Sequence, residues 1–336
     1  MRIMFVGDLC LGEFYLSFGH GPKDFSNSSN VFSNVQSIFD QADIVVGNLE
    51  APITNRNTHS KEPENSVLKA APKHAPTLKK AGFKVLQVAN NHTVQHSNEG
   101  FEDTLSTLSG LNISAVGLNN QIPVTISHGG LTYGFLAASD VPDNTDKSQN
   151  KYQRLNDVFL AQVKSQTENF DHLIVMLHWG LEASTKPLPY QRELVNQLYA
   201  SGVSAIIGSH PHLFYEVEKR DKFICAYSLG NFVFDLCWDK RMTKTGILDL
   251  EFSKNDISAK LHLVDIQENG CLPTPTGEVI DINQTITPYQ LGNSMDNQQI
   301  RKAIYFILNL HKGNTMLKIS FFTHKIIGLL KKVTRA

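Results

Sequence analysis

Two histidines separated by one proline are well placed to hold a metal ion. They are His210 and His212, in the segment GSHPH at 208–212. In an extended segment, residues two positions apart project to the same side, so both imidazoles are expected to face one cavity. Pro211 is expected to keep the backbone extended. Imidazole nitrogen suits zinc, iron, manganese or nickel, although two solvated loop histidines remain the alternative.

Four further side chains of ligand type each follow a short apolar run. Any one of them has an ordinary explanation, such as a turn residue, an acid in the first turn of a helix, or a core histidine. Carboxylate and amide oxygens next to imidazoles, however, suit manganese, magnesium or iron. With the two histidines above, the ordered set predicts a divalent-metal site. Its members are Asp8 after 3–6, Glu50 after 43–46, Asn91 after 84–88 and His178 after 173–177.

The apolar runs alternate with segments of helical periodicity. These segments are 72–81, 98–108, 152–167 and 190–200. Short β-branched runs that alternate with helices predict an α/β sheet. In open α/β sheets, functional groups collect at the carboxyl ends of the strands, so the polar turns are expected to converge on one edge.

The second half of the chain is richer in strand patterns. The runs 214–219, 223–227, 245–252 and 259–266 predict antiparallel strands joined by tight turns such as Arg220-Asp221 and Lys254-Asn255. An α/β region followed by a β-rich region predicts a sandwich of two sheets flanked by helices.

Six segments of the chain form an ordered set of motifs: GDLCLG at 7–12, NLEAPIT at 48–54, VANNH at 88–92, LHWGLE at 177–182, GSHPH at 208–212 and YSLGNFVFD at 227–235. This set resembles the calcineurin-like metallophosphoesterases, and more closely the bacterial capsule-synthesis family often called CapA, which is linked to poly-γ-glutamate production. The resemblance covers about residues 1–250 and implies a four-layer αββα sandwich of two central mixed β-sheets flanked by helices, with a C-terminal helical extension.

The resemblance also implies roles for these residues. Glu50 would bridge two metal positions, and His92 would be the general acid near the leaving group. One or two ions of manganese, iron, zinc or magnesium are implied, and they would lower the pKa of a bound water. Asp8 and His212 would hold the first ion, and Asn91, His178 and His210 the second.

Three positions depart from the phosphoesterase pattern. Cys10 stands where a ligand histidine is expected, and it is either a thiolate ligand or a small buried residue. Glu50 is one methylene longer than the usual aspartate. Thr93 stands where the phosphoesterase motif has an acid beside His92, and Gln95 stands where CapA relatives usually have aspartate. A carboxylate partner would orient His92 and raise its pKa, whereas an amide is expected only to orient it. The site is therefore expected to hold either one metal or two.

An anionic polymer or its precursor is the expected partner, and nucleic acid is not. Lys69 stands where CapA relatives often carry arginine, which would give a weaker clamp on a carboxylate because lysine binds as a point charge. Asn48, Trp179 and Asn231 are the other expected substrate contacts.

Composition predicts a cytoplasmic protein. The four cysteines are scattered without close pairing, which favours reduced thiols. No basic and apolar leader is expected at the N-terminus, and no apolar run reaches the roughly 18 residues of a spanning helix. The net charge is −1, but residues 301–336 hold eight Lys or Arg and no acidic residue, so the remainder carries about −9.

The basic C-terminal segment is predicted to be a separate amphipathic tail, 296–336, after a domain at 1–295. Residues 315–333 have helical periodicity, with an apolar face opposite Lys318, Lys325, Lys331 and Lys332. This helix could pack on its own domain, bind a partner protein, or lie on an anionic membrane. The last alternative would place the protein at the inner face of the membrane.

Three functions are consistent with these features. The first is a CapA-like metal-dependent enzyme of capsule or surface-polymer biosynthesis, acting by hydrolysis or transfer at a γ-glutamyl amide or a related bond. The second is a metallophosphoesterase acting on a phosphomonoester or phosphodiester. The third is a non-catalytic assembly component of a polymer-synthesis complex.

Overall fold

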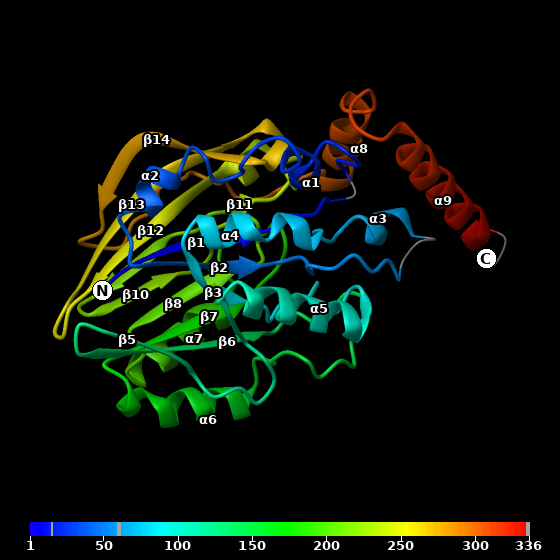
Figure 1. Cartoon of the computed structure of the whole chain (residues 1–336). Coiled ribbons are helices and arrows are strands. Elements are labelled where there is room, and N and C mark those ends of the chain that lie inside the picture. Colours follow the sequence, from blue (N-terminus) through cyan, green and yellow to red (C-terminus); the bar gives the residue numbers. More distant parts are fainter. Residues whose placement is uncertain (15, 59–61, 334–336) are drawn as a thin grey trace.

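The computed structural model describes residues 1–14, 16–58 and 62–333. The side chains of Pro63 and of residues 326–333 lie outside that description. Two sheets run through the centre of the molecule, and helices cover their outer faces (Figure 1).

The first sheet is mixed. Its parallel part consists of β1 to β4, and β11 pairs in parallel with β1. Its antiparallel part begins where β12 pairs with β1. The order across the sheet is β14 (Leu272–Asp281), β13 (Ile257–Gln267), β12 (Lys244–Phe252), β1 (Arg2–Leu9), β2 (Ile44–Leu49), β3 (Phe83–Gln87) and β4 (Ser114–Val116), with β11 (Asn231–Val233) beside β1.

The second sheet is also mixed. Its four central strands are parallel, and an antiparallel strand closes each edge. The order is β5 (Val124–His128), β6 (Leu131–Ser139), β7 (His172–His178), β8 (Ala205–Ser209), β10 (Phe223–Ala226) and β9 (Val217–Arg220).

Alternation along the buried strands sets the layers, because successive strand residues point to opposite faces. Phe5 of β1 and Met176 of β7 belong to one apolar cluster between the two sheets. Val6 belongs to a second cluster, under α2 (Gln36–Phe39), α4 (Pro76–Lys80) and α5 (Ser97–Gly110). Leu177 belongs to a third, under α6 (Asp157–Gln166) and α7 (Pro189–Ala200). The predicted sandwich of two mixed sheets between helical layers is confirmed.

Several elements differ from the sequence-based expectations. The helix expected at 152–167 begins only at Asp157, because the Asn156 side chain accepts a hydrogen bond from Phe159 N and caps it there. The segment 72–81 divides into a 3-10 turn, Pro72–His74, and α4, each with a proline at its start. Strands β4, β5, β6, β11 and β14 were not predicted.

Short helical elements complete the chain. The α-helices among them are α1 (Pro22–Phe25) and α3 (Pro63–Ser66), and the further 3-10 turns are Thr167–Asn169, Lys240–Thr243 and Glu268–Gly270.

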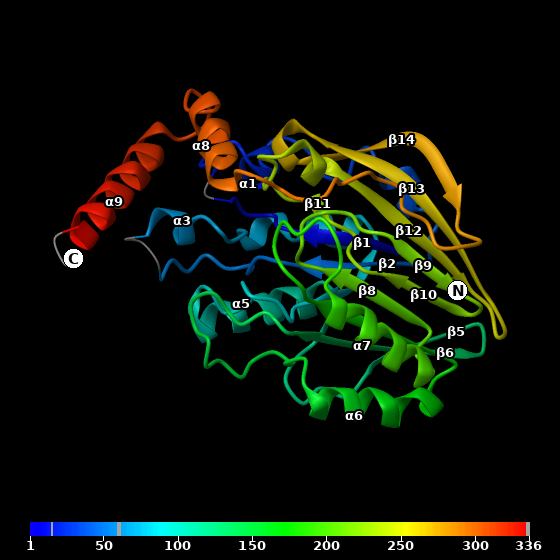
Figure 2. The ribbon, with the colours of Figure 1, turned by 180° about the vertical axis from the view of Figure 1, so that it is seen from behind.

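The C-terminal segment forms two helices, α8 (Gln298–Leu308) and α9 (Thr315–Val333), where sequence periodicity indicated one. Both lie at the end of the molecule where β1 and β2 end, and α9 runs toward α3 (Figures 1 and 2). The buried Phe306 ring of α8 lies 5.6 Å from Phe321 of α9, and Lys325 Nζ lies 2.9 Å from Glu64 Oε1 of α3. The described part of α9 therefore contacts its own domain.

Part of the predicted amphipathic face, residues 326, 327, 329, 330 and 333, lies outside the described side chains. Within the described residues, no helix combines the length and the apolar character that crossing a bilayer requires.

Candidate metal centre

The polar turns converge where the carboxyl ends of the two sheets meet. Asp8 lies near the end of β1, and Glu50 directly follows β2. From the second sheet, His178 ends β7 and His210 directly follows β8. The structure brings together, in buried positions, all six residues that the sequence singled out as ligands: Asp8, Glu50, Asn91, His178, His210 and His212.

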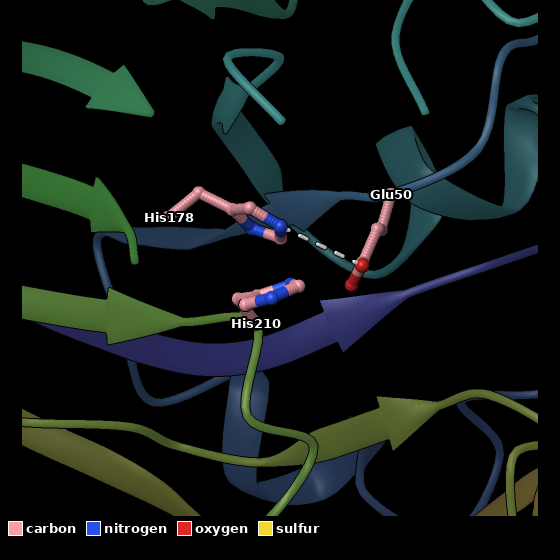
Figure 3. A group of neighbouring side chains, drawn as sticks. All are labelled: Glu50, His178 and His210. Atoms are coloured by element: carbon pink, nitrogen blue, oxygen red, sulfur yellow. Dashed lines mark ion pairs between the residues drawn. The ribbon is translucent and has the colours of Figure 1, made fainter. Parts of the chain in front are cut away.

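Glu50 is shared by two groups of potential ligand atoms. Glu50, His178 and His210 form one group and Asp8, Glu50 and His212 the other, with the ligand atoms of each within 4.8 Å of one another. Glu50 Oε1 lies 3.7 Å from His178 Nε2 and 3.7 Å from His212 Nε2. Figure 3 shows the rings of His178 and His210 beside the Glu50 carboxylate. These buried clusters of carboxylates and imidazoles could each hold a metal ion.

Three buried polar atoms of the centre have no hydrogen-bonding partner among the described residues. They are both carboxylate oxygens of Glu50 and Nδ1 of His210. Buried polar atoms are normally satisfied, and a lone buried carboxylate is costly. A divalent cation would satisfy all three atoms, so the donor set fits a metal ion.

Burial shapes the protonation of the centre. It raises the pKa of Glu50 well above its usual value, and the nearby Asp8 carboxylate adds to that effect. Burial, together with the neighbouring imidazoles, lowers the pKa of His178 well below its usual value and that of His210 to about 4. These two histidines are therefore held in the neutral form that binds metals.

His212 behaves differently from the other two histidines. Burial opposes its protonation, but the hydrogen bond and the charge of Asp8 outweigh burial and raise its pKa. Its Nδ1 lies 3.2 Å from Asp8 Oδ2 and 2.9 Å from Asn231 Oδ1. These contacts on Nδ1 leave Nε2 directed toward Glu50.

The segment that carries His210 and His212 is not extended, which corrects the expectation from the sequence. Both residues have positive φ, +96° for His210 and +59° for His212. A non-glycine residue in this region costs roughly 1–3 kcal/mol, and such strain concentrates at functional sites. The strained backbone brings His210 N to 3.4 Å from Asp8 Oδ2. The two imidazoles thus reach the centre through this bend and not through alternation along a strand.

Amide side chains orient the potential ligands. Asn48 Nδ2 donates to Asp8 Oδ1 at 2.9 Å, and Asn90 Nδ2 donates to Asn48 Oδ1 at 3.2 Å. Asn91 Oδ1 lies 2.8 Å from His178 Nε2, which places this amide oxygen at the second group. Asn90 and Ser209 were not among the predicted site residues, although both lie within the motifs VANNH and GSHPH and each directly precedes a candidate ligand.

Ser209 contacts the opposite edge of the His178 ring. Its Oγ lies 3.0 Å from His178 Nδ1. This contact on Nδ1 fixes the orientation of the ring and leaves Nε2 directed toward the centre, as is usual for metal-binding histidines.

His92 lies at the edge of the centre with a fixed orientation. Its Nδ1 is 2.6 Å from Gln95 Oε1, and its Nε2 is 4.0 Å from Glu50 Oε1. Because the amide oxygen accepts the proton of Nδ1, Nε2 faces the centre. Burial lowers the pKa of His92, and the hydrogen bond to Gln95 raises it only in part. The expectation that the amide would orient the ring without raising this pKa is therefore wrong. General-acid catalysis by His92 stays a prediction.

Cys10 packs inside the protein. Its side chain is fully buried in the apolar cluster that also contains Leu16 and Phe18. Burial, and secondarily the Asp235 carboxylate, raises the pKa of the thiol well above its usual value. Of the two interpretations drawn from the sequence, this placement favours a small buried residue over a thiolate ligand.

The expected substrate contacts have structural partners. Trp179 was expected to contact substrate, but its ring is fully buried and its Nε1 donates to Tyr227 O at 3.0 Å, so it is a core residue. Asn48 and Asn231 bind candidate ligands, as described above. Lys69 Nζ donates to Asn55 O at 3.0 Å. Substrate contact by Asn48, Lys69 or Asn231 stays a prediction.

Comparisons with known proteins agree with the motifs. The family model described as bacterial capsule synthesis protein PGA_cap matches residues 2–236. The PGA biosynthesis protein CapA of Bacillus subtilis is 26% identical over 288 residues, which are 81% of this chain and 72% of that protein. The capsule biosynthesis protein CapA of Bacillus anthracis is 27% identical over 305 residues, 84% of this chain and 71% of that protein.

Solved structures resemble the chain more distantly. A 5′-nucleotidase from Candida albicans is 10% identical, with a TM-score of 0.48, and the match covers 94% of this chain and 58% of that one. Vps29 from Chaetomium thermophilum is 9% identical, with a TM-score of 0.33, and the match covers 85% of this chain and 98% of that one.

Proposed function

The chain belongs to the bacterial capsule synthesis family PGA_cap, and from that premise we propose that it is a metal-dependent enzyme of capsule or other surface-polymer production. Its reaction is hydrolysis or transfer at a γ-glutamyl amide or a related acyl bond. Two CapA relatives, one named for PGA biosynthesis and one for capsule biosynthesis, support this choice of substrate. An anionic polymer or its precursor is the substrate class.

The observation that carries the proposal is the sharing of Glu50 by two buried groups of ligand atoms. Asp8 and His212 would hold one ion, and Asn91, His178 and His210 would hold a second, with Glu50 shared by the two groups. A divalent ion held by these residues would polarise the substrate and would lower the pKa of a coordinated water toward neutral pH.

The remaining chemistry belongs to His92. Gln95 holds the Nδ1 proton of this ring, so Nε2 faces the centre and can carry a proton to the leaving group. The Gln95 amide orients the ring and adds no negative charge beside it. Because burial favours the neutral form of His92, protonation at Nε2 is expected to need a pH below the usual range of histidine.

Two alternatives each have an observation in their favour. Hydrolysis of a phosphomonoester or phosphodiester would use the same ligand set, because paired metal sites of carboxylate and imidazole also serve phosphoryl transfer. A non-catalytic role in assembly of a polymer-synthesis complex is favoured by the buried Cys10 and by the uncharged partner of His92.

Metal analysis of the purified protein tests the site. After incubation with manganese, iron or zinc, the wild type is expected to keep at least one equivalent of metal. The His210→Ala variant is expected to lose at least one equivalent, because His210 Nδ1 has no other described partner. The control is His128→Ala, which removes a half-exposed imidazole of β5 paired with Asp43 at 3.7 Å.

The outcomes separate the three functions. Less than one equivalent of metal in the wild type would contradict both enzymatic proposals and favour the assembly role. If metal binds, release of product from oligo-γ-glutamate supports the leading proposal, whereas turnover of a chromogenic phosphodiester alone supports the phosphoesterase.

A further inference from the structure

Helix α8 lies outside residues 2–236, which match the family model, yet it contacts the segment that leads from β11. Arg301 Nη1 donates to Asp239 Oδ2 at 2.5 Å, and Tyr305 Oη lies 3.0 Å from Cys237 Sγ. The helix therefore contacts the segment that follows β11 at successive turns. This segment begins at Phe234, whose ring lies 5.1 Å from that of His212. Through this segment α8 is linked to a candidate ligand.

Lys302 of α8 is held over the indole of Trp238. Its side chain is only 16% exposed, and its Nζ lies 5.2 Å from the centroid of the Trp238 ring. Stacking of this kind favours the charged ammonium at a partly desolvated position. The ring thus fixes where the positive charge of Lys302 sits.

The ammonium group of Lys302 meets one carboxylate. Lys302 Nζ lies 3.4 Å from Glu182 Oε1, a long contact that uses one of three donors. Glu182 is 42% exposed on its side chain, so the pair has access to solvent. A ligand oxyanion could therefore reach the ammonium group without unfolding any element.

Glu182 lies beside the segments that carry the candidate ligands. Its loop directly follows β7, which ends at His178. The next residue, Ala183, donates its N–H to Pro211 O at 3.0 Å, between His210 and His212. A solvent-exposed side chain on this loop is therefore placed at the mouth of the site.

We propose that Lys302 and Glu182 form a charge-selecting pair at the mouth of the metal centre. The Lys302 ammonium binds an oxyanion of the incoming ligand, a carboxylate or a phosphate, and Glu182 competes with that ligand for the same ammonium. This inference rests on the proposed metal centre. It adds a specificity residue from outside the part of the chain that defines the family.

Anion binding to the manganese-loaded, full-length protein tests the pair. Inorganic phosphate and glutarate are titrated separately by calorimetry, which distinguishes the two oxyanion classes. Lys302→Gln is expected to weaken binding of at least one anion about tenfold, because a charge-assisted hydrogen bond is lost. Glu182→Gln is expected to tighten binding of the same anion several-fold, because it removes the competing carboxylate.

The opposite directions of the two effects exclude a merely structural cause, since damage to the mouth would weaken binding in both variants. Lys260→Gln is the matched control: it removes the same charge on β13, where Lys260 Nζ lies 3.8 Å from Asp281 Oδ1. Equal anion affinities in wild type and Lys302→Gln, or weaker binding in Glu182→Gln, overturn the charge-selecting pair. Failure of the wild type to bind manganese overturns the metal centre itself, and the pair with it.

Discussion

At the scale of single residues, Glu50 lies in surroundings that suit a metal ligand and not an isolated carboxylate. It is fully buried, its oxygens have no hydrogen-bonding partner among the described residues, and Asp8 is a second acid in the same group. Without a cation, burial of this side chain reduces the stability of the fold. The same side chain should therefore destabilise the metal-free protein and stabilise the loaded one.

The Glu50→Gln variant tests this double role. Because its raised pKa makes ionised Glu50 unfavourable in the folded state, the metal-free variant is expected to melt above the metal-free wild type at pH 8. Saturating manganese should raise the Tm of the wild type, since ligand at 100 times Kd adds about 2.7 kcal/mol, and should raise that of the variant far less. Thermal melting with and without chelator measures both effects. An equal manganese response in the two proteins would contradict the role of Glu50.

At the scale of elements, β11 and the segment after it connect the centre to the core. Asp235 lies two residues beyond β11 and is fully buried, and both of its carboxylate oxygens accept from Phe14 N, at 2.8 and 2.9 Å. Burial outweighs these hydrogen bonds and raises the pKa of Asp235 to about 7. The segment after β11 therefore contains a carboxyl group, that of Asp235, which is protonated more readily in the folded state than in the unfolded chain.

The sign of the resulting pH dependence follows from that difference. Below about pH 4 Asp235 is protonated in both states, and as pH rises toward 7 only the unfolded chain ionises readily, so stability falls. Asp235→Asn removes this loss, and its effect relative to wild type should become more favourable by about 2.6 kcal/mol between pH 5 and pH 8. Melting curves at the two pH values measure it. Asp281→Asn, at an exposed position of β14, is the control, and a pH-independent effect of Asp235→Asn would refute the account.

The elements also show how far the sequence could be interpreted. The apolar runs correctly predicted β1, β2, β3, β7 and β8, because buried parallel strands are nearly continuous in hydrophobicity. The ends of those runs identified the side chains that the fold brings together. The bend at His210 and His212 could not be predicted, since the unfavourable φ values depend on contacts from β1 and β11 that lie far away in sequence.

Other elements left weaker signals. The strand pattern of β5 is half exposed, and β4 has only three residues. Helix α8 has strong amphipathic periodicity but is separated from α9 by a short polar turn, and both were included in one predicted tail. Its contacts with Glu182 and Asp239 bridge long sequence separations, so no local pattern could reveal them.

At the scale of the whole molecule, the end that carries the metal centre also carries an apolar surface on α8. Ile300, Ile304, Ile307 and Leu308 have helical spacing, and each is more than half exposed. The nearby basic residues are largely engaged within the protein, since Arg301 binds Asp239, Lys302 binds Glu182 and Lys325 binds Glu64. Apolar insertion, more than charge, is thus what this surface offers to a membrane.

We propose that this surface contacts a membrane from one side, and full-length protein is expected to sediment with vesicles of phosphatidylglycerol and phosphatidylcholine. Ile304→Glu combined with Ile307→Glu should abolish sedimentation, because two charges would enter the apolar face. Val279→Glu, which adds a charge at a half-exposed position of β14, should leave it unchanged. Because the described basic residues mostly have acidic partners, raising the salt concentration should weaken binding less than the double substitution does. If the wild type stays in solution, or if the double variant sediments as well as the wild type, α8 does not contact the membrane and its apolar face is covered by something else.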